Sequence, residues 1–163
     1  MSELIQALSE LKNTELIFTM PNADTEGRVL IEMIEKFVSS NPNAHCYTSL
    51  GQLRYFSTLA IVDGVVGNSS SSLAEVPTFR RGTINIGDRQ LGRLKATSVI
   101  DCEPNKISIS NLLKKLYSKS FQQELNNTIN HYGEGGSVEK IIKIIKSVSL
   151  NDLIKKRFFN IEF

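Results

Sequence analysis

The feature that most constrains the fold of this chain is a regular alternation between short apolar runs and longer amphipathic segments. The apolar runs have the length of strands, whereas the segments between them carry apolar residues at helical spacing. Nearly continuous apolar strands separated by helices are typical of a parallel sheet that is covered on both faces. The sequence therefore predicts a doubly wound α/β domain. We expect strands over residues 16–20, 44–48, 61–67, 82–87 and 97–103, and helices over 3–12, 25–39 and 51–60.

Beyond Pro104 the pattern changes, because only helical periodicity remains. We expect helices over 107–118, 120–130 and 137–148, with a glycine-rich turn before the last of them. The final segment combines a basic triplet with phenylalanines, and we interpret it as a terminal helix whose aromatic side chains pack on a neighbour. We therefore expect one domain over residues 1–150 and a C-terminal tail or helix over 151–163.

Composition excludes several classes of protein. The chain has 163 residues, of which 40% are hydrophobic and 22% charged, as in an ordinary globular domain. A net charge of +2 does not favour nucleic acid binding, and no apolar run approaches the roughly 18 residues of a membrane span. The N-terminus lacks the basic start and apolar centre of a signal peptide. Cys46 and Cys102 have no metal-ligand spacing, so we expect buried free thiols in a cytoplasmic protein.

The most informative segment follows the third expected strand, where Gly67 and Asn68 precede four serines at 69–72. A helix that begins here has unpaired backbone N–H groups, and small side chains allow a phosphate to approach them. Serine hydroxyls add further donors. The alternative is structural, because Ser72 and Glu75 have the spacing of a capping box. The residues alone leave phosphate binding and helix capping both open.

Two other features extend the phosphate-binding hypothesis to a whole nucleotide. An ionised carboxylate only accepts hydrogen bonds, so Glu75 suits the vicinal hydroxyls of a ribose. In the loop after the fourth expected strand, Arg89 and Arg93 match the oxygens of a diphosphate. A surface ion pair between Asp88 and Arg89 is the alternative for that loop.

Polar residues also follow the first two expected strands. Asn22 and Asp24 come after the first strand, where capping of the next helix is the more common role for such residues. Ser49 lies in the turn between the second strand and the helix at 51–60. Because parallel strands end at the same edge of a sheet, these junctions together predict a ligand-binding cleft there.

Neither histidine is a convincing catalytic residue. His45 falls within an expected strand and is interpreted as a core or sheet residue, whereas His131 lies beside a turn and is expected to be exposed. We find no metal-ligand spacing and no pair of carboxylates suited to acid–base catalysis. The residues therefore predict no metal, no cofactor and no catalytic residue within this chain.

At this point the sequence resembles a known family. Five segments, in order and over nearly the whole chain, are similar to the hydrolysing UDP-N-acetylglucosamine 2-epimerases of bacterial sialic acid pathways. The resemblance implies the C-terminal half of a two-Rossmann-domain, glycosyltransferase B-like architecture, with a Rossmann-like parallel sheet followed by C-terminal helices. The segments are 19–28 (TMPNADTEGR), 49–57 (SLGQLRYFS), 63–79 (DGVVGNSSSSLAEVPTF), 82–105 (GTINIGDRQLGRLKATSVIDCEPN) and 132–145 (YGEGGSVEKIIKII).

The resemblance also implies a site and a reaction. Relatives eliminate UDP from UDP-N-acetylglucosamine and add water to give N-acetylmannosamine, and close relatives use a diacetamido-trideoxy sugar nucleotide instead. Ser69 and Ser70 would bind the phosphates and Glu75 the ribose, whereas Ser72 stands where most relatives carry glycine. The implied nucleotide-binding residues are Asn22, Asp24, Ser49, Gly67, Ser69, Ser70, Glu75 and Arg89.

The family's acidic catalytic domain and its Thr-His loop have no counterpart here, so we expect a domain that binds UDP or a UDP-sugar without turnover alone. A stand-alone regulatory module and the nucleotide domain of a glycosyltransferase are the alternatives. The expected partners are the absent N-terminal domain or further copies of the chain.

The resemblance also implies an absent central strand between the strands at 16–20 and 61–67, which would leave backbone groups unpaired. We therefore expect rearrangement, pairing with another chain or dependence on a missing segment. A two-state monomer with a complete sheet would contradict this hypothesis.

Overall fold

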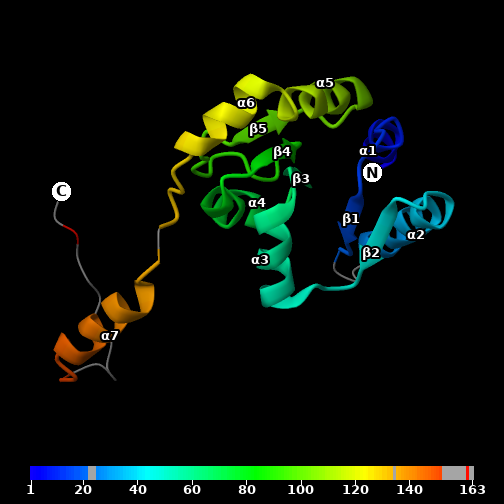
Figure 1. Cartoon of the computed structure of the whole chain (residues 1–163). Coiled ribbons are helices and arrows are strands. Elements are labelled where there is room, and N and C mark those ends of the chain that lie inside the picture. Colours follow the sequence, from blue (N-terminus) through cyan, green and yellow to red (C-terminus); the bar gives the residue numbers. More distant parts are fainter. Residues whose placement is uncertain (22–24, 134, 152–160, 162–163) are drawn as a thin grey trace. The chain divides into compact units, whose positions relative to one another are not determined.

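A computed structural model describes residues 1–21, 25–133, 135–151 and 161 (Figure 1). The chain forms two compact units, residues 1–132 and 133–163, which are described separately. The elements in order are α1 (Ser2–Leu8), β1 (Leu16–Thr19), α2 (Thr25–Ser40), β2 (Ala44–Tyr47), α3 (Gly51–Ile61), β3 (Gly64–Gly67), α4 (Ser71–Ala74), the 3-10 helix η1 (Val76–Phe79), β4 (Gly82–Ile86), β5 (Val99–Cys102), α5 (Lys106–Leu116), α6 (Lys119–Glu124), the 3-10 helix η2 (Leu125–Asn127) and α7 (Ser137–Ser147).

All strand pairs of the first unit are parallel, and a helix lies between successive strands except β4 and β5, which a loop connects. The strands form two sheets, one with the order β1-β2 and one with the order β3-β4-β5. This arrangement confirms the α/β, Rossmann-like class that the alternating pattern predicts. Among the residues that the structure describes, β1 and β3 have no neighbouring strand in common.

Side chains from the end of α5 and the start of α6 lie very close to the backbone of the three-stranded sheet. A Cβ added to Gly82 would lie 2.4 Å from Leu116 Cδ1, and one added to Gly64 would lie 2.7 Å from Leu116 Cδ2. Leu116 and Phe121 are both almost fully buried. Glycine at these two positions therefore allows the end of α5 and the start of α6 to pack directly on β3 and β4.

One hydrophobic core joins the two sheets. Ala7 and Leu8 of α1 belong to the same buried cluster as Ala44 of β2, Ile84 of β4 and Ile109 of α5. Polar contacts fix the same pair of helices, because the backbone N–H of Lys106 donates to Glu3 Oε2 at 2.8 Å. The ammonium group of Lys106 pairs with Glu10 Oε1 at 2.5 Å. Packing of α1 against α5 is thus the main link between the sheets.

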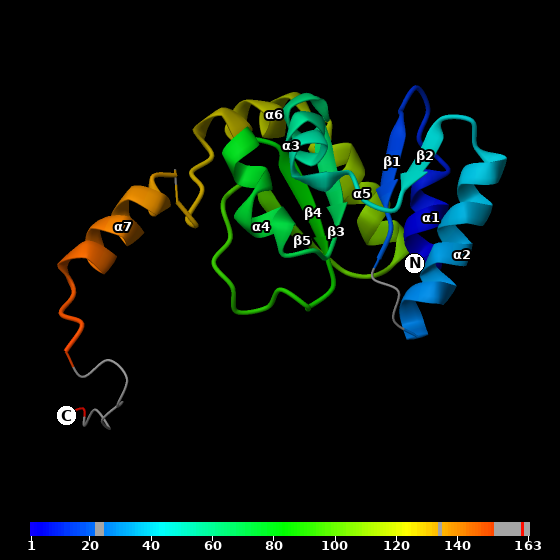
Figure 2. The same cartoon turned by 90° about the horizontal axis from the view of Figure 1, so that it is seen from below.

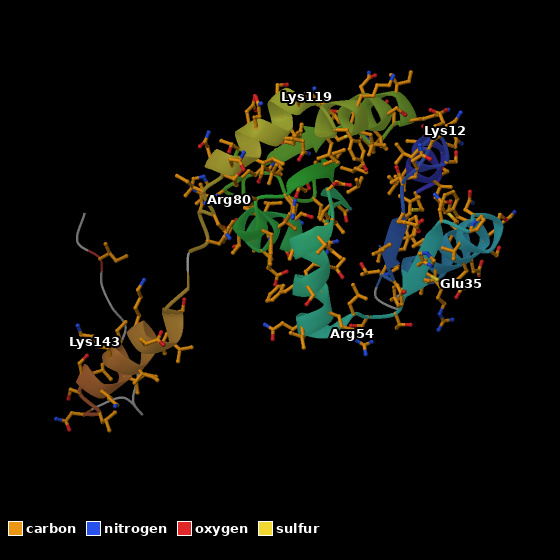
Figure 3. The ribbon with its side chains drawn as sticks, viewed as in Figure 1. Lys12, Glu35, Arg54, Arg80, Lys119 and Lys143 are labelled. Carbon is orange, nitrogen blue, oxygen red and sulfur yellow. The ribbon has the colours of Figure 1, made fainter. Side chains whose placement is uncertain are left out.

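The second unit consists of α7 and the residues around it. None of the side chains of α7 is buried, although isoleucines recur along it at helical spacing. Lys143, labelled in Figure 3, belongs to this amphipathic helix. The terminal helix expected near the C-terminus falls mostly on residues outside the described ones, so the boundary after residue 150 stays a prediction. Within the described ranges, no helix has the length and apolar character needed to cross a membrane.

Several boundaries differ from the expected ones. The helix expected over 3–12 ends at Leu8, and Asn13 then adopts a left-handed conformation with φ of 55°. The strand expected over 61–67 begins only at Gly64, because α3 continues to Ile61. The helix expected over 120–130 ends at Glu124 and tightens into η2, since two asparagines there favour helix less than most residues do.

Candidate functional site

The site predicted from the sequence lies where β3 and β4 end. These strands are parallel and paired, so their carboxyl ends emerge at one edge of the sheet. The loops that follow β3 and β4 both lie at this edge (Figure 2). Added to Gly67, the last residue of β3, a Cβ would meet no protein atom within 4 Å. Glycine is therefore not required there by protein packing, and the space beside it is open.

Asn68 holds the two loops together. Gln90 is only 2% exposed, and its Nε2 donates to the backbone oxygen of Asn68 at 2.7 Å. Arg89 Nη1 donates to Asn68 Oδ1 at the long distance of 3.5 Å. Through these contacts the basic loop after β4 is fixed beside the serine segment after β3. Gln90 is not predicted from the sequence, because nothing in its neighbourhood marks a glutamine as buried.

The serine segment does not form the capping box. Helix α4 begins at Ser71 with Ser70 as its N-cap, so Ser72 lies inside the helix. Ser72 is 1% exposed, and its hydroxyl has no partner among the described residues. The capping-box alternative is thus wrong. Ser69 and Ser70 are exposed, and Ser69 Oγ accepts a hydrogen bond from the Ser71 N–H at 3.4 Å.

Glu75 is instead part of a short chain of hydrogen bonds. Ser71 Oγ donates to Glu75 Oε2 at 2.5 Å, and the Tyr55 hydroxyl is hydrogen-bonded to the same serine oxygen. Because a serine hydroxyl has one proton, Tyr55 must act as the donor to Ser71 when Ser71 donates to Glu75. Glu75 Oε1 has no partner among the described residues. The arrangement fixes the carboxylate and leaves one of its oxygens available to a ligand.

Tyr55 keeps its proton in this environment. Burial raises the pKa of its phenol above the ordinary value of 10.0, the hydrogen bond to Ser71 lowers it, and the charge of Glu75 raises it further. A tyrosine with a raised pKa is a reliable donor at neutral pH. No sequence motif marks Tyr55, because its role depends on the packing of α3 beside α4. It is the main residue of this cluster that sequence reasoning missed.

Arg89 and Arg93 lie in the loop that follows β4. Among the residues that the structure describes, neither Arg89 nor Arg93 forms an ion pair. The alternative of an Asp88–Arg89 pair is therefore wrong in this structure. Arg89 is exposed, and its guanidinium donates a hydrogen bond to the neutral Asn68. A cation of this kind beside hydroxyl donors is suited to an anionic ligand.

The remaining predicted residues are placed less completely. Ser49 is exposed, and its Oγ accepts from the Gly51 N–H at 3.2 Å, so it stabilises the turn that begins α3. Within the described part of the chain, no hydrogen bond joins Ser49 to the serine segment. Asn22 and Asp24 lie outside the described residues, and their predicted roles remain predictions.

The histidines and cysteines considered in the sequence lie outside the candidate site. His45 lies in β2, with its exposed side chain 3.2 Å from Glu15 Oε2, and His131 is exposed at a turn. Both cysteines are free, but only Cys102 is buried, so the expectation that both are buried is wrong for Cys46. Within the described ranges, no three His, Cys, Asp or Glu side chains are grouped so that they could hold a metal ion.

A second polar cluster lies on β4 and β5, outside the predicted site. Asn85 Nδ2 and Lys95 Nζ both donate to Asp101 Oδ1 at 2.7 Å. The hydrogen bond from Lys95 is the main reason why the pKa of Asp101 is lowered. Asp101 is thus ionised and partnered, which makes it a structural acceptor rather than a proton donor.

Comparison with known proteins identifies the family. The family model described as UDP-N-acetylglucosamine 2-epimerase matches residues 1–146. A GDP/UDP-N,N'-diacetylbacillosamine 2-epimerase (hydrolyzing) from Campylobacter jejuni is 39% identical over 160 residues, which are 97% of this chain and 41% of that protein. The polysialic acid biosynthesis protein P7 of Escherichia coli is 34% identical over 95% of this chain and 38% of its own length. The chain spans about two fifths of the length of these relatives.

Solved structures agree on the fold. A Staphylococcus aureus structure described as an MnaA–UDP co-structure matches with a TM-score of 0.71 at 17% identity, over 88% of this chain and 39% of that one. At this identity the match supports the fold, including the parallel sheets with flanking helices. The family model covers most of the sequence, and the fold agrees with it. The chain therefore belongs to the UDP-N-acetylglucosamine 2-epimerase family.

Proposed function

We propose that this chain binds UDP, alone or as part of a UDP-sugar, at the loops that follow β3 and β4. The observation that supports this most strongly is the Tyr55–Ser71–Glu75 chain of hydrogen bonds, which fixes the Glu75 carboxylate. Family membership and the name of the UDP-bound structural neighbour support the same ligand.

The ribose and the diphosphate of the nucleotide each have a complementary group. Oε1 of Glu75, which has no protein partner in the described residues, would accept from the ribose hydroxyls. The exposed hydroxyls of Ser69 and Ser70 would donate to the phosphates, and the Arg89 guanidinium would neutralise part of their charge. Gly67 would leave room for the phosphates. Helix α4 has only four residues, so the hydroxyl and guanidinium groups carry this assignment more than a helix dipole does.

The reaction that we propose for the complete enzyme is hydrolytic 2-epimerisation of a UDP-linked N-acetylated sugar. In that reaction UDP leaves the sugar and water is added, and the present chain would hold the UDP. The name of the Campylobacter relative favours an N,N'-diacetylbacillosamine nucleotide as the substrate. Because the chain spans 41% of that relative and its described residues include no acid–base pair, we propose that it does not turn over a UDP-sugar alone.

Calorimetric titration of the chain with UDP tests the proposal. We expect saturable 1:1 binding that Glu75→Gln weakens by about tenfold or more, since a charged hydrogen bond contributes about 1.5–3 kcal/mol. The matched control is Glu35→Gln on the exposed surface of α2, which should leave the affinity unchanged (Figure 3 labels Glu35). Equal affinities for the wild-type chain and Glu75→Gln would refute the ribose assignment. Absence of UDP binding would refute the proposed function itself.

A further inference from the structure

The segment over residues 128–132, which follows η2 and ends the first unit, is hydrogen-bonded to both parts of the candidate site. Asn130 Nδ2 donates to the backbone oxygen of Ala74, the last residue of α4, at 2.8 Å. The Tyr132 hydroxyl donates to the backbone oxygen of Leu94, in the loop after β4, at 3.2 Å. In Figure 1 this segment passes α4 after it leaves α6. One short segment, distant in sequence, thus contacts both elements that carry the predicted nucleotide-binding residues.

The Ala74 oxygen depends on Asn130 because its own helix offers it no donor. The residue three positions later is Pro77, which has no backbone N–H. The next N–H along the chain, that of Thr78, donates to the backbone oxygen of Glu75 at 3.0 Å. The Asn130 side chain therefore supplies the hydrogen bond that the end of α4 lacks.

This hydrogen bond acts directly beside Glu75. The Ala74 carbonyl belongs to the planar peptide group that joins Ala74 to Glu75, so a donor that fixes this oxygen also fixes the plane. Glu75 lies at the junction of α4 and η1, with φ of −113° and ψ of −48°. Orientation of this plane determines the direction in which the Glu75 side chain leaves the backbone. Asn130 is thus placed to orient the carboxylate from the backbone side.

Asn130 is itself fixed by three hydrogen bonds. Besides the bond to Ala74, its Nδ2 donates to Thr78 Oγ1 at 2.7 Å. Its Oδ1 accepts from the Tyr132 N–H at 2.9 Å. Two acceptors therefore face the amide nitrogen and one donor faces the amide oxygen, which defines a single orientation of the side chain. The last of these bonds also ties Asn130 to Tyr132.

Tyr132 holds the later part of the loop that carries the arginines. Gln90 fixes the beginning of this loop through Asn68, whereas Leu94 lies near its end and has a side chain that is 67% exposed. Because the Leu94 side chain is not packed, the hydrogen bond from Tyr132 is the interaction that holds this part of the loop. Arg89 lies in the same loop, so its position depends on both contacts.

We propose that Asn130 and Tyr132 are positioning residues of the nucleotide site, Asn130 for Glu75 and Tyr132 for the loop of Arg89. The proposal rests on the proposed UDP site and deepens it with two residues that act without touching the nucleotide. Because coupling between two parts of a protein is reciprocal, bound UDP should in turn stabilise the segment over residues 128–132.

The first test is calorimetric titration of Asn130→Ala with UDP. We expect about fivefold weaker binding, because the loss of one neutral hydrogen bond is transmitted to the carboxylate. The matched control is Asn111→Ala on the exposed surface of α5, which should leave the affinity unchanged. In a Glu75→Ala background, where no carboxylate remains to be oriented, we expect Asn130→Ala to change the affinity by less than about twofold. An unchanged affinity in the first titration, or the full loss in the Glu75→Ala background, would overturn the role of Asn130.

Tyr132→Phe tests the second contact with little risk to folding, since the side chain is exposed and only its hydroxyl is removed. We expect UDP binding to weaken by about two- to threefold, and this loss to disappear in an Arg89→Ala background. The matched control is Tyr117→Phe at the end of α5, whose exposed hydroxyl has no partner among the described residues. Equal affinities of Tyr132→Phe and the wild-type chain would overturn the role of Tyr132.

Amide hydrogen exchange on the wild-type chain gives a readout that does not depend on variants. Saturation with UDP should slow exchange of the Tyr132 N–H, which donates to Asn130, by at least about threefold. Unchanged exchange at this amide in the UDP complex would overturn the proposal. The two proposals remain distinguishable. Absence of UDP binding to the wild-type chain refutes the proposed function and this inference together, whereas normal UDP binding by Asn130→Ala and Tyr132→Phe refutes this inference alone.

Discussion

Replacing Gly82 by alanine tests the close contact between the helices and the sheet that carries the site. The new Cβ would lie 2.4 Å from Leu116 Cδ1 and 2.8 Å from Phe121 Cε1. Both side chains are at most 3% exposed, so neither has free space into which it can move. Overpacking of this kind costs about 1–3 kcal/mol, whereas the lower entropy of the unfolded alanine chain returns about 0.4–1 kcal/mol. We expect a net destabilisation of about 1–2 kcal/mol.

Urea unfolding followed by circular dichroism measures this difference. The matched experiment is a double-mutant cycle with Leu116→Ala, which removes the atom nearest to the new Cβ. We expect Gly82→Ala to lower the free energy of unfolding by at least about 0.5 kcal/mol less in the Leu116→Ala variant than in the wild-type chain. A neutral or stabilising Gly82→Ala, or full additivity with Leu116→Ala, would refute the close approach of α5 to β4.

Three further predictions concern the site and its surroundings. Tyr55→Phe removes the donor to Ser71 and should weaken UDP binding by about two- to tenfold in calorimetry; an unchanged affinity would refute its role in positioning Glu75. Arg89→Ala should weaken UDP binding and reduce its dependence on salt, whereas an affinity equally sensitive to salt in both proteins would exclude a phosphate contact. Lys95 lowers the pKa of Asp101, so the Lys95–Asp101 pair stabilises the fold above the unfolded pKa near 4, and this stabilisation is lost as the pH falls below it. We therefore expect acid unfolding to begin at a higher pH in Lys95→Met than in the wild-type chain. Onset at the same pH in both proteins would show that the pair contributes nothing.

The sequence predicts the parallel strands well because their apolar runs are continuous. β4 is buried along almost its whole length, although two of its residues, Thr83 and Asn85, are polar. Helix ends were predicted less well. The end of α1 depends on a left-handed Asn13, and the end of α6 depends on a change to 3-10 geometry, neither of which has a strong signal in one sequence.

The candidate site was predicted in part for a similar reason. Gly67, the serines and Arg89 follow directly after strands, so their position at one edge follows from the parallel topology. Tyr55 and Gln90 enter the site through packing between elements that are distant in sequence, and no local pattern specifies such contacts. The capping-box alternative for Ser72 rested on its spacing to Glu75, whereas the N-cap of α4 is Ser70, two residues earlier.

The most direct test of the account is to follow the backbone amide resonances of the isotopically labelled chain during titration with UDP. We expect the largest shifts at Gly67, which ends β3, and at Ser69, Ser70 and Arg89 in the loops that follow β3 and β4. Shifts confined to other parts of the chain, or no shifts at millimolar UDP, would contradict the assignment of these loops as the nucleotide site.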